Sequence, residues 1–544
     1  NAGNSIVSGG NFNTVVGDEA GTAITTGDLM TAVGYKALFT EDTGERSTAV
    51  GAFALTAQNA AVENYNTAVG YAAGTAVTTG VGNTFIGGLA GDATTTADNN
   101  TAVGYLSLSA NTTGHSNIAI GKSSLAANTD GHSNVSVGYL SLASNTTADF
   151  NTGLGHKTLL LNTTGASNTA VGYHALDANT TASNNTAVGT SALTANTTGS
   201  ENTAVGMSAL TANTTAANNA AFGVAALAAN TTGASNTALG RAAMEANTTG
   251  AQNTAVGHKA LDSNTTASNN TAVGYQTLNA ATTGANNTSI GMNSMAANTT
   301  GGSNVAVGGS ALGANTTASN NTAVGNDALT ANTTGTQNTA VGAASLSSNT
   351  TANNNVAVGY ETLRDNTTGA SNTAIGHNSM VVNTTGANCT AVGNFALLFN
   401  TTAANNTAVG LSALQANTTG DASTAVGKDS MLRNTTGRFN SSLGYESLAL
   451  NTTGANLTAL GKAALYNNTT GSSNTAVGMN AGSAITTGFE NTCIGYAAGD
   501  ALTTGNNNII IGQSVDADSV SQANAIVIGV GFQGAGNDFS FGKA

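Results

Sequence analysis

The strongest constraint on the fold of this chain is a unit of seventeen residues that returns without interruption over most of its length. Between Asn66 and Asn508 the same position recurs in twenty-six steps of seventeen residues, which makes twenty-seven units. Three more units begin at Asn13, Met30 and Ser47, with a two-residue insertion near residue 60. A fixed period of this length predicts a solenoid, in which each coil buries its apolar side against the coils before and after it.

The unit has the consensus N-T-A-V-G-Y-x-A-L-x-A-N-T-T-G-x-N, and we number its positions 1 to 17 from the first asparagine. Glycine stands at position 5 in all thirty units, and the segments between glycines are too short for a stable helix. We therefore expect an all-β fibre, a repetitive β-solenoid or β-roll with two short strands and two turns in each coil. Residues 1–12 form a lead-in, residues 13–512 form the array, and residues 513–544 form a C-terminal segment.

The first half of the coil reads as a strand that ends at a glycine. Positions 2 and 4 take threonine or apolar residues, such as Thr169 and Val171, and we expect both to point into the core. Position 3 is alanine in nearly every coil, which predicts a thin outer face that a partner chain can approach closely. Gly172 at position 5 suits a bend or a positive φ.

The second half of the coil offers one large apolar residue and then a polar turn. Leu176 at position 9 is expected in the core. Asn179, Thr180 and Thr181 at positions 12 to 14 are expected in a turn with the glycine that often follows, because asparagine and glycine tolerate left-handed backbone. Identical side chains, among them Asn168 at position 1, would lie above one another and hydrogen-bond as ladders along the coils.

A few coils exchange residues between positions 9 and 12. Leu176 and Asn179 occupy these positions in the common type of coil, whereas Gly74 and Val77 occupy them in the other type. The same exchange places Ile24, Ile485 and Leu502 at position 12 of coils that have glycine at position 9. We infer that both positions fill one core space, which cannot be filled twice without overpacking.

Composition narrows the functions open to the chain. The formal net charge of −14 is spread thinly with no basic patch, so we expect no nucleic-acid partner. No stretch approaches the roughly 18 to 20 apolar residues of a membrane-spanning helix, so we expect no membrane insertion. Only 7% of residues are charged and proline is absent, which is unlike most disordered chains. The two cysteines, Cys389 and Cys493, are too distant in the array to form a disulfide framework or a zinc cluster.

The small apolar content of each coil favours assembly of several chains. A coil has only two large apolar side chains to set against the ordering of seventeen residues. Packing between chains adds burial that one chain lacks. We therefore expect a parallel homo-oligomer, most simply a trimer.

No catalytic, cofactor-binding or metal-binding residue is predicted, and the chain is not expected to be an enzyme. A catalytic site needs unlike residues in one place, whereas a repeat supplies like residues everywhere. His115 and His132 share position 16 of adjacent coils and are expected to stack, but they lack further ligands for a metal ion. The frequent Asn-Thr-Thr also matches the N-glycosylation sequon, although turn geometry alone accounts for those residues.

Two stretches carry a resemblance to known proteins: NTAVGYHALDANTTASNNTAVG, from Asn168, and NTCIGYAAGDALTTGNNNIIIG, from Asn491. They resemble the repeat in fibre proteins of bacteriophages and phage-like structures that precedes an intramolecular chaperone of the endosialidase type, the S74 peptidase family. The resemblance covers residues 13–512 and implies a chaperone that drives trimerisation and then cuts itself away. The ending NAIVIGVGFQGAGNDFSFGKA is similar to the segment before such a boundary. The chaperone's catalytic residues have no counterpart in this sequence, so its protease activity is not carried over.

The unit is more distantly similar to the NSVAIG repeats in the head of YadA-like trimeric autotransporter adhesins, which form a left-handed parallel β-roll. The chain departs from that family in its period and in having no heptad stalk.

These resemblances imply a structural protein without enzymatic activity. We expect a trimeric phage tail fibre for host attachment, located in the virion, with a glycan or a protein of the host surface as receptor and with no cofactor. The alternative is a bacterial cell-surface adhesin or extracellular filament. A third hypothesis is an ice-binding solenoid, which would need threonine rows on a flat strand face, whereas the paired threonines of positions 13 and 14 fall in a turn.

Overall fold

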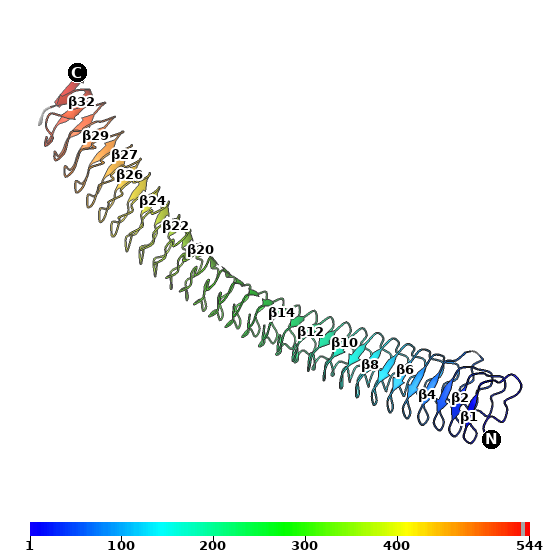
Figure 1. The fold of residues 1–544 in the computed structure, drawn as a ribbon. Coiled ribbons are helices and arrows are strands. Elements are labelled where there is room, and N and C mark those ends of the chain that lie inside the picture. Colours follow the sequence, from blue (N-terminus) through cyan, green and yellow to red (C-terminus); the bar gives the residue numbers. More distant parts are fainter. Residues whose placement is uncertain (62, 535–538, 544) are drawn as a thin grey trace. The chain divides into compact units, whose positions relative to one another are not determined.

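The computed structural model describes residues 1–61, 63–534 and 539–543, which form two compact units made of residues 1–269 and 270–544. The described residues contain strands and turns but no helix (Figure 1). The strands of the first unit are β1 (Thr14–Val16), β2 (Thr31–Val33), β3 (Thr48–Val50), β4 (Thr67–Val69), β5 (Thr84–Ile86), β6 (Thr101–Val103), β7 (Ile118–Ile120), β8 (Val135–Val137), β9 (Thr152–Leu154), β10 (Thr169–Val171), β11 (Thr186–Val188), β12 (Thr203–Val205), β13 (Ala220–Phe222), β14 (Thr237–Leu239) and β15 (Thr254–Val256). Those of the second unit are β16 (Thr271–Val273), β17 (Thr288–Ile290), β18 (Val305–Val307), β19 (Thr322–Val324), β20 (Thr339–Val341), β21 (Val356–Val358), β22 (Thr373–Ile375), β23 (Thr390–Val392), β24 (Thr407–Val409), β25 (Thr424–Val426), β26 (Ser441–Leu443), β27 (Thr458–Leu460), β28 (Thr475–Val477), β29 (Thr492–Ile494), β30 (Ile509–Ile511), β31 (Asp516–Ala517), β32 (Ile526–Val530), β33 (Gln533–Gly534) and β34 (Phe539–Lys543).

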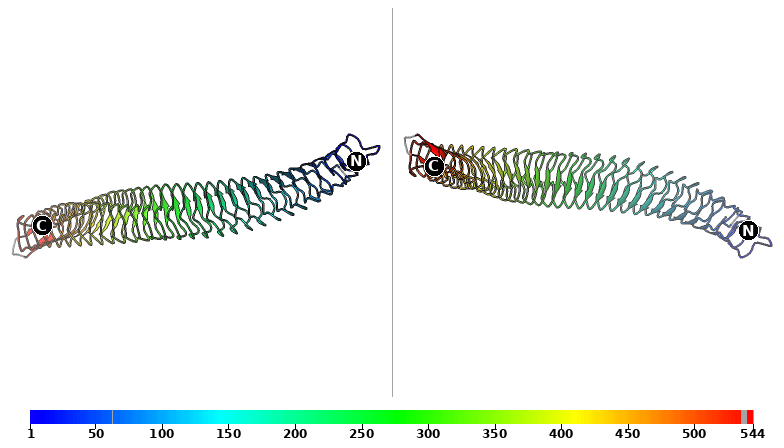
Figure 2. Two further views of the ribbon diagram at one scale, coloured as in Figure 1. Left: turned by 90° about the horizontal axis from the view of Figure 1, so that it is seen from below. Right: turned by 90° about the horizontal axis from the view of Figure 1, so that it is seen from above.

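Each unit is a parallel β-solenoid, which confirms the predicted all-β class. From β1 to β30, leaving β31 aside, each coil contributes one three-residue strand that pairs with the strands of the neighbouring coils, and Figure 2 shows the coils of each unit from two further sides. β10 and β11 pair Ala170 with Ala187, a register offset of one coil. The same coil positions therefore lie above one another throughout each unit.

Backbone hydrogen bonds join neighbouring coils outside the strands as well as within them. The N–H of Thr169 donates to the carbonyl oxygen of Asn185 at 2.8 Å, next to the strand. In the second half of the coil, the N–H of Thr180 donates to the carbonyl oxygen of Thr197 at 3.1 Å. Because these bonds connect coil to coil, the turns satisfy their backbone groups in the same direction as the strands do.

The predicted second strand is wrong for the described coils before Asn508, and among the described strands only β31, in the coil that begins at Asn508, and β33, one coil later, pair in the second half of a coil. Positions 7 and 9 have positive φ, 54° at His174 and 55° at Leu176, with a residue of ordinary φ between them. A strand needs extended backbone at every residue, so this alternation produces consecutive turns instead. The polar turn also differs from the prediction, because Asn179 does not have positive φ and the left-handed residue is Asn184 at position 17, with φ of 62°.

The two faces of the strand are the reverse of the prediction. Ala170 at position 3 is fully buried, whereas Thr169 and Val171 at positions 2 and 4 are only half-buried and face outward. Val171 is therefore not a core residue, and alanine does not form a thin outer face. The same order of burial recurs from β2 onward.

The reason for this inversion is that the core of a coil is thin. Gly153 replaces the alanine of position 3 in β9, and a Cβ atom there would lie 2.9 Å from Thr158 Oγ1 and 3.5 Å from Leu142 Cδ1. Thr158 and Leu142 stand at positions 8 and 9, so position 3 packs directly against them. A leucine at position 9 leaves room for little more than a methyl group opposite, and alanine supplies it.

The predicted insertion lies between β3 and β4, which pair with an offset of nineteen residues. Beside it Glu41, at position 12, is fully buried. Its carboxylate accepts hydrogen bonds from the Gly44 N–H at 2.9 Å, from Gln58 Nε2 at 2.8 Å and from Asn64 Nδ2 at 3.1 Å. These donors compensate for the burial of the charge.

The coil pattern extends beyond the predicted array at both ends. β32 pairs with β30 one coil away, with Ile526 opposite Ile509. This coil has Ala525 at position 1 instead of asparagine, so the repeat of asparagines does not mark its start. At the other end, the Gly3 N–H donates to the carbonyl oxygen of Ala20 at 2.9 Å, so residues 1–12 are bonded to the first coil of the array.

Candidate functional site

Two rows of buried asparagines run along the coils. Asn179 at position 12 donates from Nδ2 to Asn162 Oδ1 at 2.7 Å and to the carbonyl oxygen of Ala182 at 2.9 Å. Asn168 at position 1 donates from Nδ2 to the same Ala182 oxygen at 2.9 Å, and its N–H donates to Asn151 Oδ1 at 3.0 Å. The two rows meet at position 15, so the buried amides are satisfied by their own coil and by the next one.

The threonines of the polar turn have different surroundings. Thr180 is half-buried and donates from Oγ1 to the carbonyl oxygen of Thr197 at 3.1 Å, whereas Thr181 is exposed. Asn179, the first residue of this sequon, is buried, with its amide nitrogen bonded inside the coil. The asparagines of the sequons that start at position 12 therefore serve the ladder.

The apolar residues of positions 9 and 12 lie in the core. Leu176 is fully buried, and so are the four residues that replace it from position 12: Ile24, Val77, Ile485 and Leu502. Gly172 ends the strand with φ of 133°, and a Cβ atom there would lie 2.6 Å from the carbonyl oxygen of Gly189. Position 5 thus needs glycine both for its backbone conformation and for the close approach of the next coil.

A third position shares the same core space. Phe85 at position 3 is fully buried, and both its own coil and the coil before it have glycine at position 9. A Cβ atom on Gly74 would lie 2.7 Å from Phe85 Cδ2, and one on Gly91 would lie 2.5 Å from Phe85 Cε1. The large residue at position 3 therefore occupies the volume that leucine occupies in other coils.

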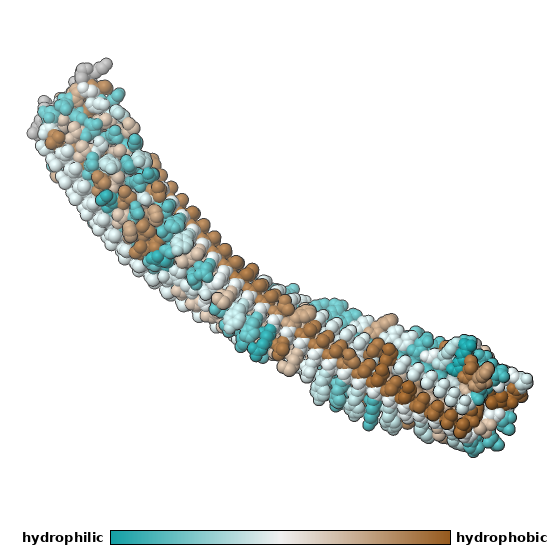
Figure 3. All heavy atoms as spheres, in the orientation of Figure 1, coloured by the Kyte–Doolittle hydropathy of each residue, from teal (hydrophilic) through white to brown (hydrophobic). Residues whose placement is uncertain are grey.

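The main functional candidate is the outer face of the strands, made of positions 2 and 4 of successive coils, which we call the strand face. Its apolar members include Ile120, Leu154 and Leu239, whose residues are 38%, 48% and 49% exposed. Figure 3 shows a row of hydrophobic side chains that passes from coil to coil. Aspartate, glutamate, lysine and arginine are absent from positions 2 and 4 in all thirty coils of the array.

Aromatic side chains border the strand face at position 6 in several coils. The ring centroid of His156 lies 5.3 Å from that of Tyr139 and 5.1 Å from that of Tyr173. The rings of His156 and Tyr173 are stacked. His174 Nδ1 lies 2.6 Å from Asp177 Oδ2, which holds this histidine beside the row. Tyr139 and Tyr173 are exposed, so this row widens the apolar surface in these coils.

The predicted pair of histidines at position 16 does stack. The ring centroids of His115 and His132 are 4.1 Å apart, with 17° between the ring planes. Among the described residues, no group of three or more histidine, cysteine, aspartate or glutamate side chains is placed to hold a metal ion.

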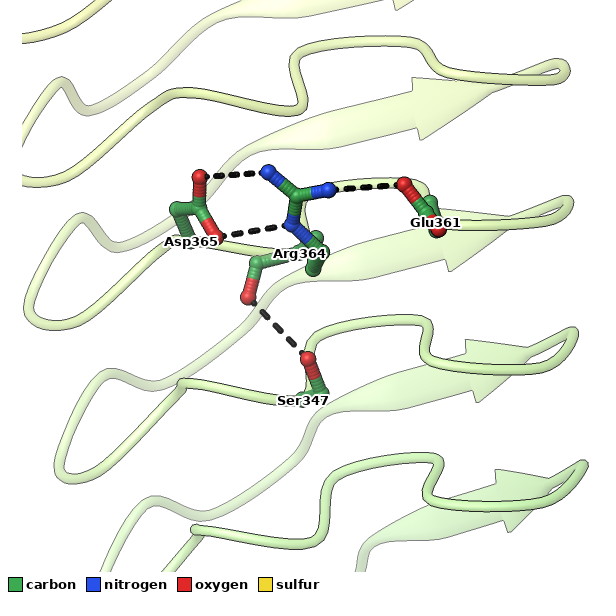
Figure 4. Close-up of polar contacts among 4 residues, drawn as sticks. All are labelled: Ser347, Glu361, Arg364 and Asp365. Carbon is green, nitrogen blue, oxygen red and sulfur yellow. Dashed lines mark hydrogen bonds and ion pairs between the residues drawn. The ribbon is translucent and has the colours of Figure 1, made fainter.

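Arg364 of the second unit is paired with two carboxylates. Arg364 bonds both oxygens of Asp365, from Nε at 2.9 Å and from the second guanidinium nitrogen at 3.0 Å, and it donates to Glu361 Oε2 at 2.8 Å (Figure 4). Ser347 of the preceding coil donates to the backbone carbonyl of Arg364 at 3.4 Å. The hydrogen bond to Asp365 is the main cause that raises the pKa of Arg364. With its guanidinium occupied by two carboxylates, this group is a surface brace and not an anion site.

Burial is the main reason for the raised pKa of three titratable groups in the second unit. Burial raises the pKa of the Cys389 thiol to about 11 and that of the Cys493 thiol to about 12. Burial also raises the pKa of Asp516 to about 7, and a hydrogen bond with Asp500 acts in the same direction. The N–H of Ala501 donates to Asp516 Oδ1 at 3.1 Å and partly opposes this shift.

Neither the shape of the surface nor similarity to known proteins points to a further site. Within residues 1–61, 63–534 and 539–543 no pocket was found, and no helix in this part of the chain is long and apolar enough to cross a membrane. The chain matches no protein-family model and no curated protein.

Proposed function

We propose that this chain is a structural, non-enzymatic shaft of a trimeric phage tail fibre, which holds host-binding surfaces away from the particle. The resemblance of the repeat to phage fibre repeats supplies the biological setting. The virion is the location that follows from this proposal.

The observation that carries the proposal is the continuity of the buried asparagine row. In the first unit it runs from Asn111 to Asn264 in steps of one coil, each Nδ2 donating to the Oδ1 of the preceding coil. In the second unit the same row runs from Asn298 to Asn468. Separating two coils within either row breaks this bond together with the backbone bonds at the same boundary, which suits a load-bearing shaft.

Receptor binding in this proposal uses side chains that the coil does not need for its own packing. Positions 7, 10, 16 and 17 vary from coil to coil, so they can carry a surface for a host glycan or protein without disturbing the ladders. A tip domain encoded elsewhere in the same gene would serve the same purpose.

The test is to sequence the gene beyond Ala544. An endosialidase-type chaperone domain is the expected result. A coiled coil followed by a β-stranded membrane anchor would overturn the proposal in favour of a bacterial cell-surface adhesin.

One observation favours ice binding as a second candidate function. Threonine at position 2 faces outward on the strands and recurs at the same register in successive coils, as in Thr169, Thr186 and Thr203. This regular, uncharged row meets the condition that the turn threonines did not. Thermal hysteresis of the purified protein tests it, and a solution that freezes without hysteresis would remove this candidate.

A further inference from the structure

We infer that the strand face of each unit is the surface through which parallel copies of this chain pack in register. The inference rests on the proposed fibre function for the parallel direction of the copies. It replaces the alanine face expected from the sequence, because those alanines lie in the core.

The first argument is the apolar character of this face. Position 4 is valine, isoleucine, leucine or phenylalanine in every coil of the array. In the first unit Ile86, Leu154 and Phe222 are 40%, 48% and 40% exposed although each is a large apolar residue. A row of such side chains that continues from coil to coil exceeds the scattered apolar exposure of ordinary monomers.

The second argument is the distribution of charge. The chain has 26 acidic and 12 basic residues, and all of them lie outside positions 2 and 4. Charges do occur at position 6, at the border of the face, as in Lys122 and Arg241. An uncharged centre with a partly charged border is the usual composition of a buried interface. All copies carry the same net negative charge and therefore repel one another. An uncharged face is the surface on which this repulsion is weakest.

The third argument is the available area. Three strand residues of about 3.3 Å each, and fifteen coils about 4.8 Å apart, give a face of roughly 10 by 70 Å in each unit. This is on the order of 700 Å², close to the 800 Å² or so that one partner buries in a stable interface. The aromatic residues at position 6, such as Tyr139 and Tyr173, add to it.

The choice of a second copy as the occupant follows from the period. Thr169, Thr186 and Thr203 repeat at one-coil intervals, and so do Val171, Val188 and Val205. A partner matches such rows along their whole length only if it has the same spacing. Another copy of the chain has that spacing by construction, and a parallel arrangement in register brings the same coil positions of the copies to the same height along the solenoid.

The main experiment introduces one cysteine into the full chain at the strand face. Val188→Cys places a thiol at position 4 of β11, and Thr198→Cys, in the exposed polar turn of the same coil, is the matched control. Both variants keep the two native cysteines, which are buried. Mild oxidation is expected to link Val188→Cys chains covalently at least tenfold more than Thr198→Cys chains. Equal linking of the two variants would overturn the inference.

A second experiment measures assembly directly. The triple variant Val171→Lys, Val188→Lys and Val205→Lys is expected to sediment as single chains, whereas the wild type sediments as a trimer. The control carries the same added charge in the exposed turns of the same coils, as Thr181→Lys, Thr198→Lys and Thr215→Lys, and should remain trimeric. Circular dichroism shows whether each variant retains β structure. If the lysine variant does not fold, the cysteine experiment still tests the inference.

Other outcomes separate this inference from the proposed function. A wild-type chain that sediments alone would overturn the inference, and thermal hysteresis in that case would assign the strand face to ice. A chain that cross-links through position 188 but whose gene continues into a coiled coil and a β-stranded membrane anchor would leave the interface standing and overturn the tail-fibre proposal.

Discussion

A Cβ atom on Gly482 would lie 3.0 Å from Cδ1 of Ile485, three residues further along the same coil. The same relationship holds between Gly21 and Ile24, where the distance would be 2.7 Å. Positions 9 and 12 therefore reach one space, as the exchange in the sequence suggested. Since φ is 56° at Gly482 and 51° at Gly21, the glycine also relieves a backbone conformation that leucine adopts at a cost in the other coils.

Filling this space twice should destabilise the second unit. Gly482→Leu is expected to lower the free energy of unfolding by about 1–3 kcal/mol, because the leucine overpacks the core against Ile485. Adding Ile485→Asn removes the clash and continues the row of asparagines that ends at Asn468, so the double variant should recover most of the loss. Urea unfolding of the two single variants and the double variant measures the coupling, and strictly additive changes would contradict a shared space.

Emptying the same space in the middle of an asparagine row should be harder to rescue. Leu176→Gly is expected to cost about 2–5 kcal/mol through the cavity that it leaves. Adding Asn179→Val refills the cavity but removes the Nδ2 donor that bonds Asn162 Oδ1 at 2.7 Å. The second change should therefore recover only part of the loss. Full recovery in urea unfolding would show that the row contributes little.

The asparagine row itself can be tested against an exposed neighbour. Asn179→Ala removes three hydrogen bonds, leaving Asn162 Oδ1 without its donor and Asn196 Nδ2 without one of its acceptors, which should cost about 1–3 kcal/mol. Thr181→Ala, in the exposed part of the same turn, should change stability by no more than about 0.5 kcal/mol. Thermal unfolding of the two variants compares them, and equal melting temperatures would argue against the ladder as a source of stability.

The C-terminal part of the second unit should lose stability as the pH rises. Asp516 ordinarily titrates near 3.8, and burial raises its pKa to about 7 in the folded chain. The folded state therefore keeps a proton that the unfolded state releases. This contribution is complete below about pH 4 and is lost as the pH rises through 7. Unfolding from pH 4 to pH 8 should show this decline in the wild type and a weaker decline in Asp516→Asn, and parallel curves would contradict the assignment.

The two thiols should be unreactive until the coils open. Cys389 and Cys493 are buried, and their pKa values are raised to about 11 and about 12 by that burial, so little thiolate forms near neutral pH. A thiol reagent at pH 8 should label neither residue in the native protein and both in denaturant. Rapid labelling of Cys493 without denaturant would show that the coils around it open readily.

Much of the architecture was open to prediction because it depends on period and chemistry alone. An unbroken repeat requires coils that stack in the same register, and rows of identical asparagines follow from that stacking. The exchange between Leu176 and Val77, at positions 9 and 12, also revealed a shared core volume without any coordinates.

The strand faces were mispredicted because alternation in T-A-V does not distinguish its two sides. Alanine suits a thin core as well as a thin surface, and valine suits a core as well as an interface between chains. One signal was present in the sequence. Position 4 changes from valine to phenylalanine, as at Phe222, with no compensating glycine. Phe85 at position 3, in contrast, has glycine at position 9 both in its own coil and in the coil before it. Only a packed position needs such compensation.

By itself, the sequence determined the period, the all-β class, the parallel register and the rows of asparagine, because each of these follows from identical residues at identical spacing. Only the tertiary structure decided which side of the strand is inside and how the second half of the coil runs. The first depends on the distance between Ala170 and the layer of Leu176, and the second on the positive φ values of His174 and Leu176. Both arise when the coil closes on itself, since only the closed coil sets the thickness of the core and the directions that its turns must take.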